Sequence, residues 1–235
     1  MAIKDNLAAI QQRIAAACER AGRDFAEVTL VAVSKTFPVT DVEEAIAAGL
    51  RVFGENRIQE AAEKIPALQP LTGKHNVQWH LIGHLQSNKA RRAVELFDAV
   101  QTVDSLKLAQ RLNDLAGELG KRLPVFLEVN VGGESAKAGI EPSAALELCE
   151  QVAKLSHLEL RGWMTVPPFL DDADAVRPYF RQLRALRDEA LRLGLADTQA
   201  KELSMGMSND FAVAIEEGAT FIRIGTALFG ARDYT

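Results

Sequence analysis

The chain has 235 residues, of which 48% are hydrophobic and 25% are charged, and its formal net charge is −5. This is the composition of an ordinary globular protein. The acidic balance argues against a basic surface for nucleic acid, and no apolar run approaches the roughly 18 residues that a membrane-spanning helix requires. The amino terminus leads into an amphipathic pattern rather than a signal-peptide core. We therefore expect a cytoplasmic protein without nucleic-acid or membrane partners.

The two cysteines, Cys18 and Cys149, fall on helical patterns beside apolar neighbours. Disulfides are rare in the cytoplasm. We therefore expect both residues to be small members of a hydrophobic core, and a redox role is the less favoured interpretation.

The hydrophobic pattern predicts a helix over residues 5–21, with Gly22 as its carboxyl-terminal cap. Eight segments of strand character follow, each with a helical pattern or a turn behind it. The expected strands cover residues 28–36, 51–54, 77–82, 98–103, 124–131, 158–166, 202–205 and 220–224. The expected helices cover residues 41–48, 58–64, 105–119, 143–155, 174–193 and 210–217. A further helix is expected to start near residues 87–88, and a final turn is expected at 227–230. Pro66, Pro70 and Gly73 predict a loop after the helix at 58–64.

Strict alternation of strands and helices predicts a parallel sheet. Eight such units at this length fit a single (β/α)₈ TIM barrel in the α/β class. An open doubly wound sheet is the rival, but no G-x-G-x-x-G motif follows the first strand. We expect one domain over residues 1–235, with an extra amino-terminal helix at 1–24 and the barrel at 28–232.

The first expected strand is apolar and ends in Lys35. If Lys35 faces the barrel interior, alternation places Val31 and Val33 beneath it. Burial disfavours the ammonium form of lysine, and a neutral amine is what a Schiff base with a carbonyl compound requires. The alternative is a lysine whose side chain extends from the strand end to solvent.

Two other strand ends offer candidate binding residues, because chemistry in such barrels gathers at the carboxyl ends of the strands. Asn56 follows the second strand, where it could bind a ligand or cap the helix that begins at Arg57. Met164 closes the sixth strand, where it could line an aromatic ligand or be an ordinary core methionine.

The loops after strands seven and eight have the composition of a phosphate site, which recurs at this place in TIM barrels. Gly206 and Gly225 let the backbone approach an anion closely. The candidate hydroxyl donors are Ser204, Ser208 and Thr226. Ordinary turn and capping chemistry is the alternative explanation.

Arg223 is the odd residue in an apolar strand, and alternation points it inward with Phe221. An inward arginine needs a partner. Glu128 on the fifth strand could be a structural partner, whereas a ring nitrogen or phosphate of a ligand would be a functional one. The lysine, the phosphate loops and the arginine together describe a site for pyridoxal 5′-phosphate (PLP).

Five segments carry a resemblance to a known family. They are Ala32-Val33-Ser34-Lys35-Thr36, Phe53-Gly54-Glu55-Asn56, the stretch from His80 to Lys89, Ser204-Met205-Gly206-Met207-Ser208-Asn209-Asp210, and the stretch from Arg223 to Arg232. They are similar to the YggS/PROSC family, the PLP homeostasis proteins, and the match covers nearly the whole chain.

The resemblance implies a barrel of the alanine-racemase N-terminal type (fold-type III) that holds PLP as a Schiff base on Lys35. It implies that Arg223 faces the pyridine nitrogen. The residues implied to hold the phosphate or complete the pocket are Asn56, Ser204, Gly206, Ser208, Gly225 and Thr226. His84 stands where proline would be equally expected.

Several other polar residues are discounted. His80 and His84 are four apart, but Gly83 and the strand pattern argue against the helix that a metal pair would need. Lys89 and Lys137 are predicted to be solvated. The acidic segment 171–174 is predicted to mark a helix start.

Three functions remain open from the sequence. A PLP carrier or buffer in vitamin B6 homeostasis is favoured over a PLP-dependent racemase, because an arginine opposite the ring nitrogen weakens the ring as an electron sink. A racemase also needs a second acid/base, for which the chain offers only Tyr179 and Tyr234. A Schiff-base aldolase is the third possibility. We expect a monomer that makes transient contacts with PLP-dependent apoenzymes.

Overall fold

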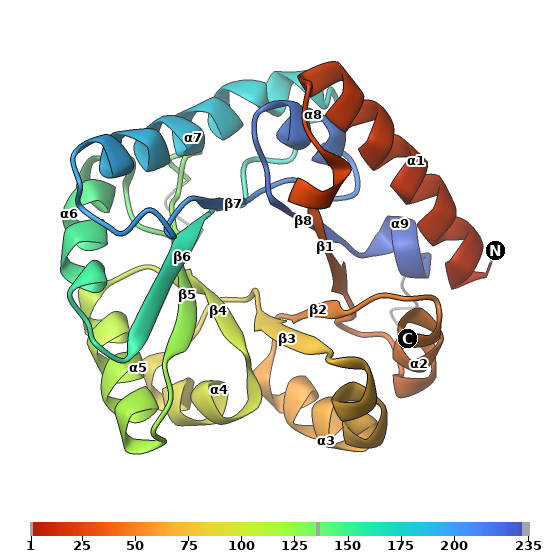
Figure 1. Ribbon diagram of the computed structural model, residues 1–235, viewed down its shortest axis with the longest axis horizontal. Helices are drawn as coiled ribbons and strands as arrows, with labels where there is room; N and C mark the ends of the chain where they lie inside the picture. The colour runs from red at the N-terminus through yellow and green to blue at the C-terminus, as the bar shows by residue number, and fades with distance from the viewer. Residues whose placement is uncertain (1, 135–136, 232–235) are drawn as a thin grey trace.

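The computed structural model describes residues 2–134 and 137–231, and its strands form one closed parallel barrel in sequential order (Figure 1). β8 pairs with β1 and so closes the ring. The strands are β1 (Thr29–Val33), β2 (Val52–Glu55), β3 (Gln78–Leu81), β4 (Ala99–Val103), β5 (Leu123–Glu128), β6 (Leu158–Met164), β7 (Glu202–Ser204) and β8 (Phe221–Ile224). The (β/α)₈ architecture predicted from alternation is confirmed.

An outer layer of helices surrounds the barrel (Figure 1). The α-helices are α1 (Ile3–Ala21), α2 (Val39–Ala47), α3 (Ile58–His75), α4 (Ala90–Leu96), α5 (Leu106–Glu118), α6 (Pro142–Ala153), α7 (Arg177–Arg192), α8 (Phe211–Glu216) and α9 (Thr226–Phe229). Short 3₁₀ helices are η1 (Phe25–Glu27), η2 (Ser87–Lys89) and η3 (Asp174–Val176). Gly22 caps α1 in the left-handed conformation, as predicted.

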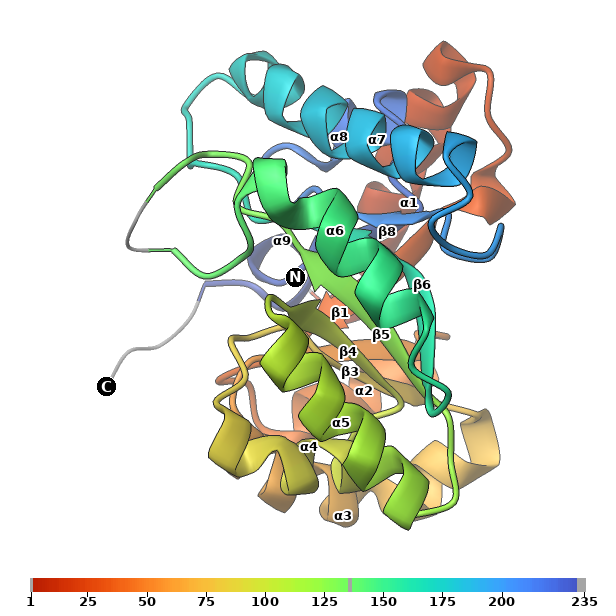
Figure 2. The same cartoon turned by 90° about the vertical axis from the view of Figure 1, so that its left-hand side faces the viewer.

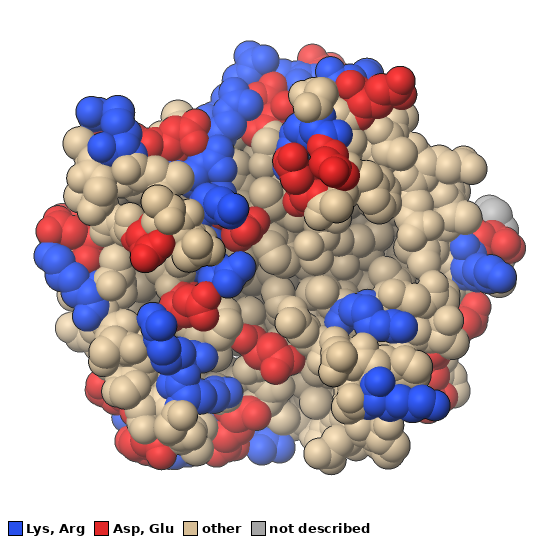
Figure 3. Space-filling view, viewed as in Figure 1, with Lys and Arg blue, Asp and Glu red and all other residues tan. Residues whose placement is uncertain are grey.

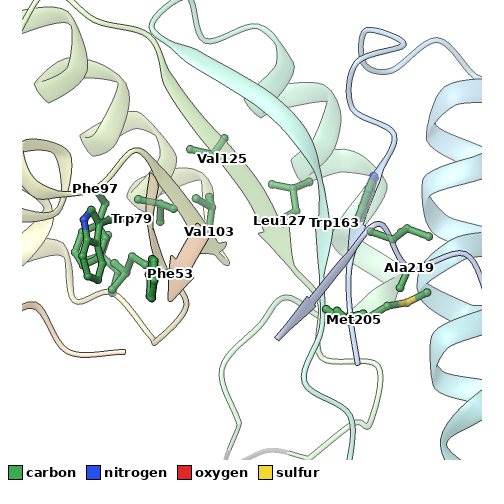
Figure 4. Close-up of a cluster of buried hydrophobic side chains, with 14 of the residues drawn as sticks. Phe53, Trp79, Phe97, Val103, Val125, Leu127, Trp163, Met205 and Ala219 are labelled. Atoms are coloured by element: carbon green, nitrogen blue, oxygen red, sulfur yellow. The ribbon is translucent and has the colours of Figure 1, made fainter. Parts of the chain in front are cut away.

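The main hydrophobic core lies between the strands and this helical layer. Phe53, Trp79 and Phe97 lie together in one part of it, while Trp163, Met205 and Ala219 lie in another (Figure 4). Cys18 and Cys149 are buried in the same core as free thiols, as expected. Burial of this apolar surface is the main force that closes the barrel.

The predicted loop at Pro66 and Pro70 is wrong, because α3 continues through both prolines to His75. Each proline removes one helical N–H. The two prolines are four residues apart on the exposed side of the helix, so water can reach the carbonyl groups that lose a partner. Leu68, which is fully buried, anchors the opposite side of α3 in the core.

α1 lies outside the barrel against α8 and α9 (Figure 1). Asn6 donates from Nδ2 to the carbonyl oxygen of Leu228 at 2.8 Å, and the guanidinium of Arg13 lies 4.3 Å from the centre of the Phe211 ring. The amino-terminal helix therefore supports the segment that follows β8.

The two ends of the barrel differ. The loops after β5 and β6 project to one side of the molecule, where the strands end (Figure 2). At the opposite face, lysine and arginine side chains run from α7 toward a central hollow (Figure 3). A cavity of about 550 Å³ opens there between residues such as Arg161, Arg187 and Lys201. It lies at the amino ends of the strands, away from Lys35, whereas active sites in TIM barrels lie at the carboxyl ends of the strands.

Candidate functional site

Lys35 lies in a turn just beyond β1. The strand ends at Val33, so the expectation that Lys35 itself closes the strand is wrong by two residues. Lys35 is half-buried rather than extended fully into solvent. Val31 and Val33 do face the interior, since both are buried but lie outside the outer core, which contains their neighbour Ala32.

Arg223 points into the barrel, as alternation predicts. It is 4% exposed, while its neighbours Ile222 and Ile224 pack in the outer core. Nη1 donates to Oγ of Ser204 at 2.8 Å and Nη2 donates to the carbonyl oxygen of Thr165 at 2.7 Å. A guanidinium has five N–H groups, and within the described residues the other three, Nε–H among them, donate to no protein acceptor, so they remain available to a ligand.

A chain of hydrogen bonds continues from Arg223 across the barrel interior. Because Arg223 donates to Ser204 Oγ, the hydroxyl proton goes to Oε1 of Gln101, 2.6 Å away. Nε2 of Gln101 then faces Nδ1 of His80 at 2.8 Å. An amide nitrogen can only donate, so Nδ1 of His80 is the acceptor and the imidazole is neutral. Burial lowers the pKa of His80 to about 4, which agrees with this arrangement.

The sequence reasoning missed Gln101 and assigned His80 no positive role. Gln101 could have been found by the signal that identified Arg223, namely a polar residue inside an apolar strand. Gln101 and Thr102 both interrupt the apolar β4, and both are fully buried.

Glu128 ends β5 and is 7% exposed. Its Oε2 is buried and has no hydrogen-bond partner. Burial raises the pKa of Glu128 to about 7, the Asp104 carboxylate adds to this rise, and Arg223 opposes it. Among the ion pairs of the described residues, none joins Glu128 to Arg223. The structural partner suggested for Arg223 is therefore replaced by Ser204 and the carbonyl of Thr165.

The loops after β7 and β8 meet at the same end of the barrel. Ser208 Oγ accepts a hydrogen bond of 3.3 Å from the backbone N–H of Ala227. Asp210 is buried and its Oδ1 accepts from the N–H of Met207 at 2.6 Å, which closes the first of the two loops. Burial raises the pKa of Asp210.

The two glycines of these loops are both buried. Gly206 has a φ of +92°, and a Cβ there would lie 2.5 Å from Cβ of Ala214. Gly225 is buried at the amino end of α9, while Thr226, the first residue of that helix, is exposed. The structure thus brings Gly206, Ser208, Gly225 and Thr226 into one loop cluster.

The remaining predicted residues lie around the barrel end. Asn56 is half-buried after β2, and the alternative that it caps the next helix fails, because the residue before α3 is Arg57. Met164 is fully buried at the end of β6, where it pairs in register with Glu128 and Ser204. It lies outside the outer hydrophobic core.

Some discounted residues behave differently from expectation. Lys137 is not simply solvated, since its Nζ lies 2.8 Å from Glu134 and donates to the carbonyl of Pro167 at 3.2 Å. Lys89 is half-buried beside α4 rather than fully solvated. His84 is exposed, with Nδ1 3.4 Å from Asp104. Within the described chain no cluster of His, Cys, Asp or Glu could hold a metal ion, and no helix could cross a membrane.

Tyr179 lies on α7 and packs against the hydrophobic core. Tyr234 and Arg232, which also entered the sequence argument, lie outside the described residues. This end of the barrel therefore combines the amine of Lys35, a buried guanidinium with open N–H donors, a buried carboxyl group and two loops with hydroxyl and backbone donors. Such a set suits an anionic ligand that carries an aldehyde and a polar ring atom.

Comparison with known proteins decides the family. The alanine racemase N-terminal domain family matches residues 6–233. A pyridoxal phosphate homeostasis protein of Pasteurella multocida is 45% identical, with both chains covered completely, and one of Pseudomonas aeruginosa is 49% identical, with 99% of this chain and 96% of that protein covered. This chain belongs to the pyridoxal phosphate homeostasis protein family.

Solved structures agree with this membership of the pyridoxal phosphate homeostasis protein family. PipY of Synechococcus elongatus PCC7942, solved with PLP bound, is 40% identical over 97% of this chain and all of that one, with a TM-score of 0.84. An alanine racemase of Clostridium difficile 630 is 16% identical, with a TM-score of 0.73, and this chain covers 57% of it. That likeness concerns the fold alone.

Proposed function

We propose that this chain binds PLP at the carboxyl-terminal end of its barrel and acts in PLP homeostasis as a carrier or buffer. In this proposal Lys35 holds PLP as a Schiff base and Arg223 faces the pyridine nitrogen. Ser208, Gly225 and Thr226 bind the phosphate. The residues that complete the pocket are Asn56, Met164, Ser204 and Gly206. When bound, PLP supplies a reactive aldehyde and an electron-withdrawing ring.

The observation that carries this proposal is the fixed side chain of Arg223. Its two terminal nitrogens donate one hydrogen bond each, to Ser204 and to the carbonyl of Thr165, which leaves Nε–H and the second N–H of each terminal nitrogen for a ligand atom. Burial lowers the pKa of Arg223 to about 10, while Glu128 and Asp210 oppose that effect, so the guanidinium is charged at neutral pH. The PLP-bound state of the relative PipY and the names of the curated relatives support the same ligand.

The fixed arginine also favours a carrier over an enzyme. A charged guanidinium keeps the facing ring nitrogen unprotonated, which weakens the ring as an electron sink. Racemisation further requires an acid/base on the second face of the substrate. Tyr179 is packed in the helical layer and does not fill that role.

Absorbance tests this proposal directly. Purified protein mixed with PLP should turn yellow, and borohydride should fix the ligand on the peptide that contains Lys35. The Lys35→Ala variant should lose the reducible chromophore. Lys89→Ala, which changes another half-buried lysine, should keep it.

Three results would contradict the proposal. One is wild-type protein that forms no reducible chromophore. Another is Lys35→Ala protein that keeps the wild-type chromophore. The third is steady racemisation of an amino acid that disappears in Lys35→Ala, which would make the protein an enzyme.

A further inference from the structure

The turn that carries Lys35 has an unusual backbone. Ser34 is fully buried, and Thr36 has a φ of +69°, in the left-handed region. A β-branched residue is disfavoured there, since its Cβ crowds the backbone. The surroundings of the turn must therefore supply the interactions that hold this conformation.

Helix α3 supplies interactions on both sides of Lys35. Lys64 donates from Nζ to the carbonyl oxygen of Ser34 at 2.8 Å. Glu60, one helical turn earlier, accepts the backbone N–H of Thr36 at 2.5 Å through Oε1. The carbonyl before Lys35 and the N–H after it are thus both bound by side chains of one helix.

The two side chains are in turn fixed by a buried ion cluster. Lys64 Nζ lies 2.7 Å from Oε1 of Glu55 and 2.8 Å from Oε1 of Glu60. Ser34 Oγ also donates to Glu55 Oε1 at 2.7 Å. Lys64 is 5% exposed, and its three N–H donors meet three acceptors, namely Glu55, Glu60 and the Ser34 carbonyl. Lys64 is therefore committed to the protein and is not a second site for an aldehyde.

We infer that Glu60 and Lys64 are positioning residues that hold the 34–36 turn so that the amine of Lys35 meets the aldehyde of PLP. This inference rests on the proposed function. Both residues are inferred to act through the backbone on either side of Lys35, to which their side chains are bound. The geometry assigns Glu60 a specific task, which is to hold Thr36 in its left-handed conformation.

Glu60→Ala tests this task, with Glu63→Ala as the matched control. Glu63 is an exposed glutamate on the same helix. We expect Glu60→Ala to bind PLP about tenfold more weakly than wild type, because the variant loses one charge-assisted hydrogen bond. Binding is measured by titration of the reducible chromophore, and peptide mapping after borohydride reports occupancy of Lys35. Glu63→Ala should bind as wild type does.

A second substitution separates positioning from a general loss of structure. Glycine adopts positive φ without strain, so Thr36→Gly should restore most of the lost affinity in a Thr36→Gly/Glu60→Ala double variant. The inference is overturned if the double variant binds as weakly as Glu60→Ala, or if Glu60→Ala binds as tightly as wild type.

Amide hydrogen exchange gives a readout that does not require PLP. In the protein without added PLP, the Thr36 amide should exchange faster in Glu60→Ala than in wild type or Glu63→Ala, because its acceptor is gone. Equal protection in all three proteins overturns the inference. If wild-type protein forms no adduct with PLP, the proposed function fails, and the exchange at Thr36 still decides whether Glu60 holds the turn.

Discussion

Ser204 accepts the Nη1–H of Arg223 at 2.8 Å, and the same hydroxyl donates to Gln101 at 2.6 Å. One small side chain thus links the arginine to the hydrogen-bond chain of the barrel interior. Ser204→Ala leaves a guanidinium donor and an amide acceptor buried without this partner, which costs about 1–3 kcal/mol of unfolding free energy. Denaturant unfolding measures the loss, and Ser156→Ala, at an exposed serine, is the control. Equal stability of the two variants would contradict the role of Ser204.

Glu128 should make the stability of the protein depend on pH. Burial raises its pKa to about 7, from a usual value of 4.5, so the folded state binds the proton more tightly than the unfolded state. The stability linked to this proton is present at low pH and is lost as the pH rises from 4.5 to 7, by up to about 3 kcal/mol. Glu128→Gln should therefore gain stability relative to wild type at pH 8 but not at pH 4. Unfolding of the ligand-free proteins at both values checks this, with exposed Glu63→Gln as control. An equal difference at both pH values would argue against a buried titrating group.

His80 should make the stability of the protein depend on pH in the opposite direction to Glu128, with stability lost on acidification. Its pKa is lowered from 6.5 to about 4 by burial, so the folded state binds the proton more weakly than the unfolded state. Stability is then lost as the pH falls from 6.5 to 4, by about 3 kcal/mol. His80→Asn, which keeps an acceptor for Gln101, should show a smaller acid-induced loss. His84→Asn, at an exposed histidine, should show the wild-type loss. Nitrogen-15 NMR that found His80 protonated at pH 6 would refute the assignment.

A side chain at Gly206 should destabilise the folded protein more than one at an uncrowded glycine. Ala at this position meets Ala214 Cβ at 2.5 Å and the Phe211 Cα at 3.0 Å, in addition to the strain of a φ of +92°. Gly194 provides the control, because its φ is +66° but nothing lies within 4 Å of an added Cβ. We expect Gly194→Ala to cost about 1 kcal/mol for the left-handed backbone alone, and Gly206→Ala to cost a further 1–3 kcal/mol for overpacking. Thermal unfolding compares the two, and equal costs would mean that the loop shifts without penalty.

Sequence reasoning recovered the barrel because hydrophobic periodicity is a local signal. It failed at Pro66 and Pro70, where tertiary packing of Leu68 and an exposed position for the prolines outweigh the local tendency to break the helix. It also extended β1 to Lys35, since a β-branched run does not reveal that the ladder ends at Val33.

For the candidate site, the residues named from pattern and resemblance do lie at the carboxyl ends of their strands or in the loops that follow. Their partners were not predictable from local sequence. Gln101 and Arg223 are joined through Ser204 across more than a hundred residues of chain, and only the closed barrel brings them together. Glu60 and Lys64 resemble surface charges on an amphipathic helix, and their bonds to the 34–36 turn become visible only in three dimensions.

The position of α1 has a consequence for the order of folding. This helix is synthesised before the barrel strands, yet it packs against α8 and α9, and one of the two neighbours of β1 is β8. During synthesis α1 and β1 therefore keep part of their apolar surface uncovered until α8, β8 and α9 have left the ribosome. Contacts of such large sequence separation form slowly. Closure of the ring should be the late step in folding, and the proposed ligand site, which combines Lys35 after β1 with the loops after β7 and β8, should become competent only then.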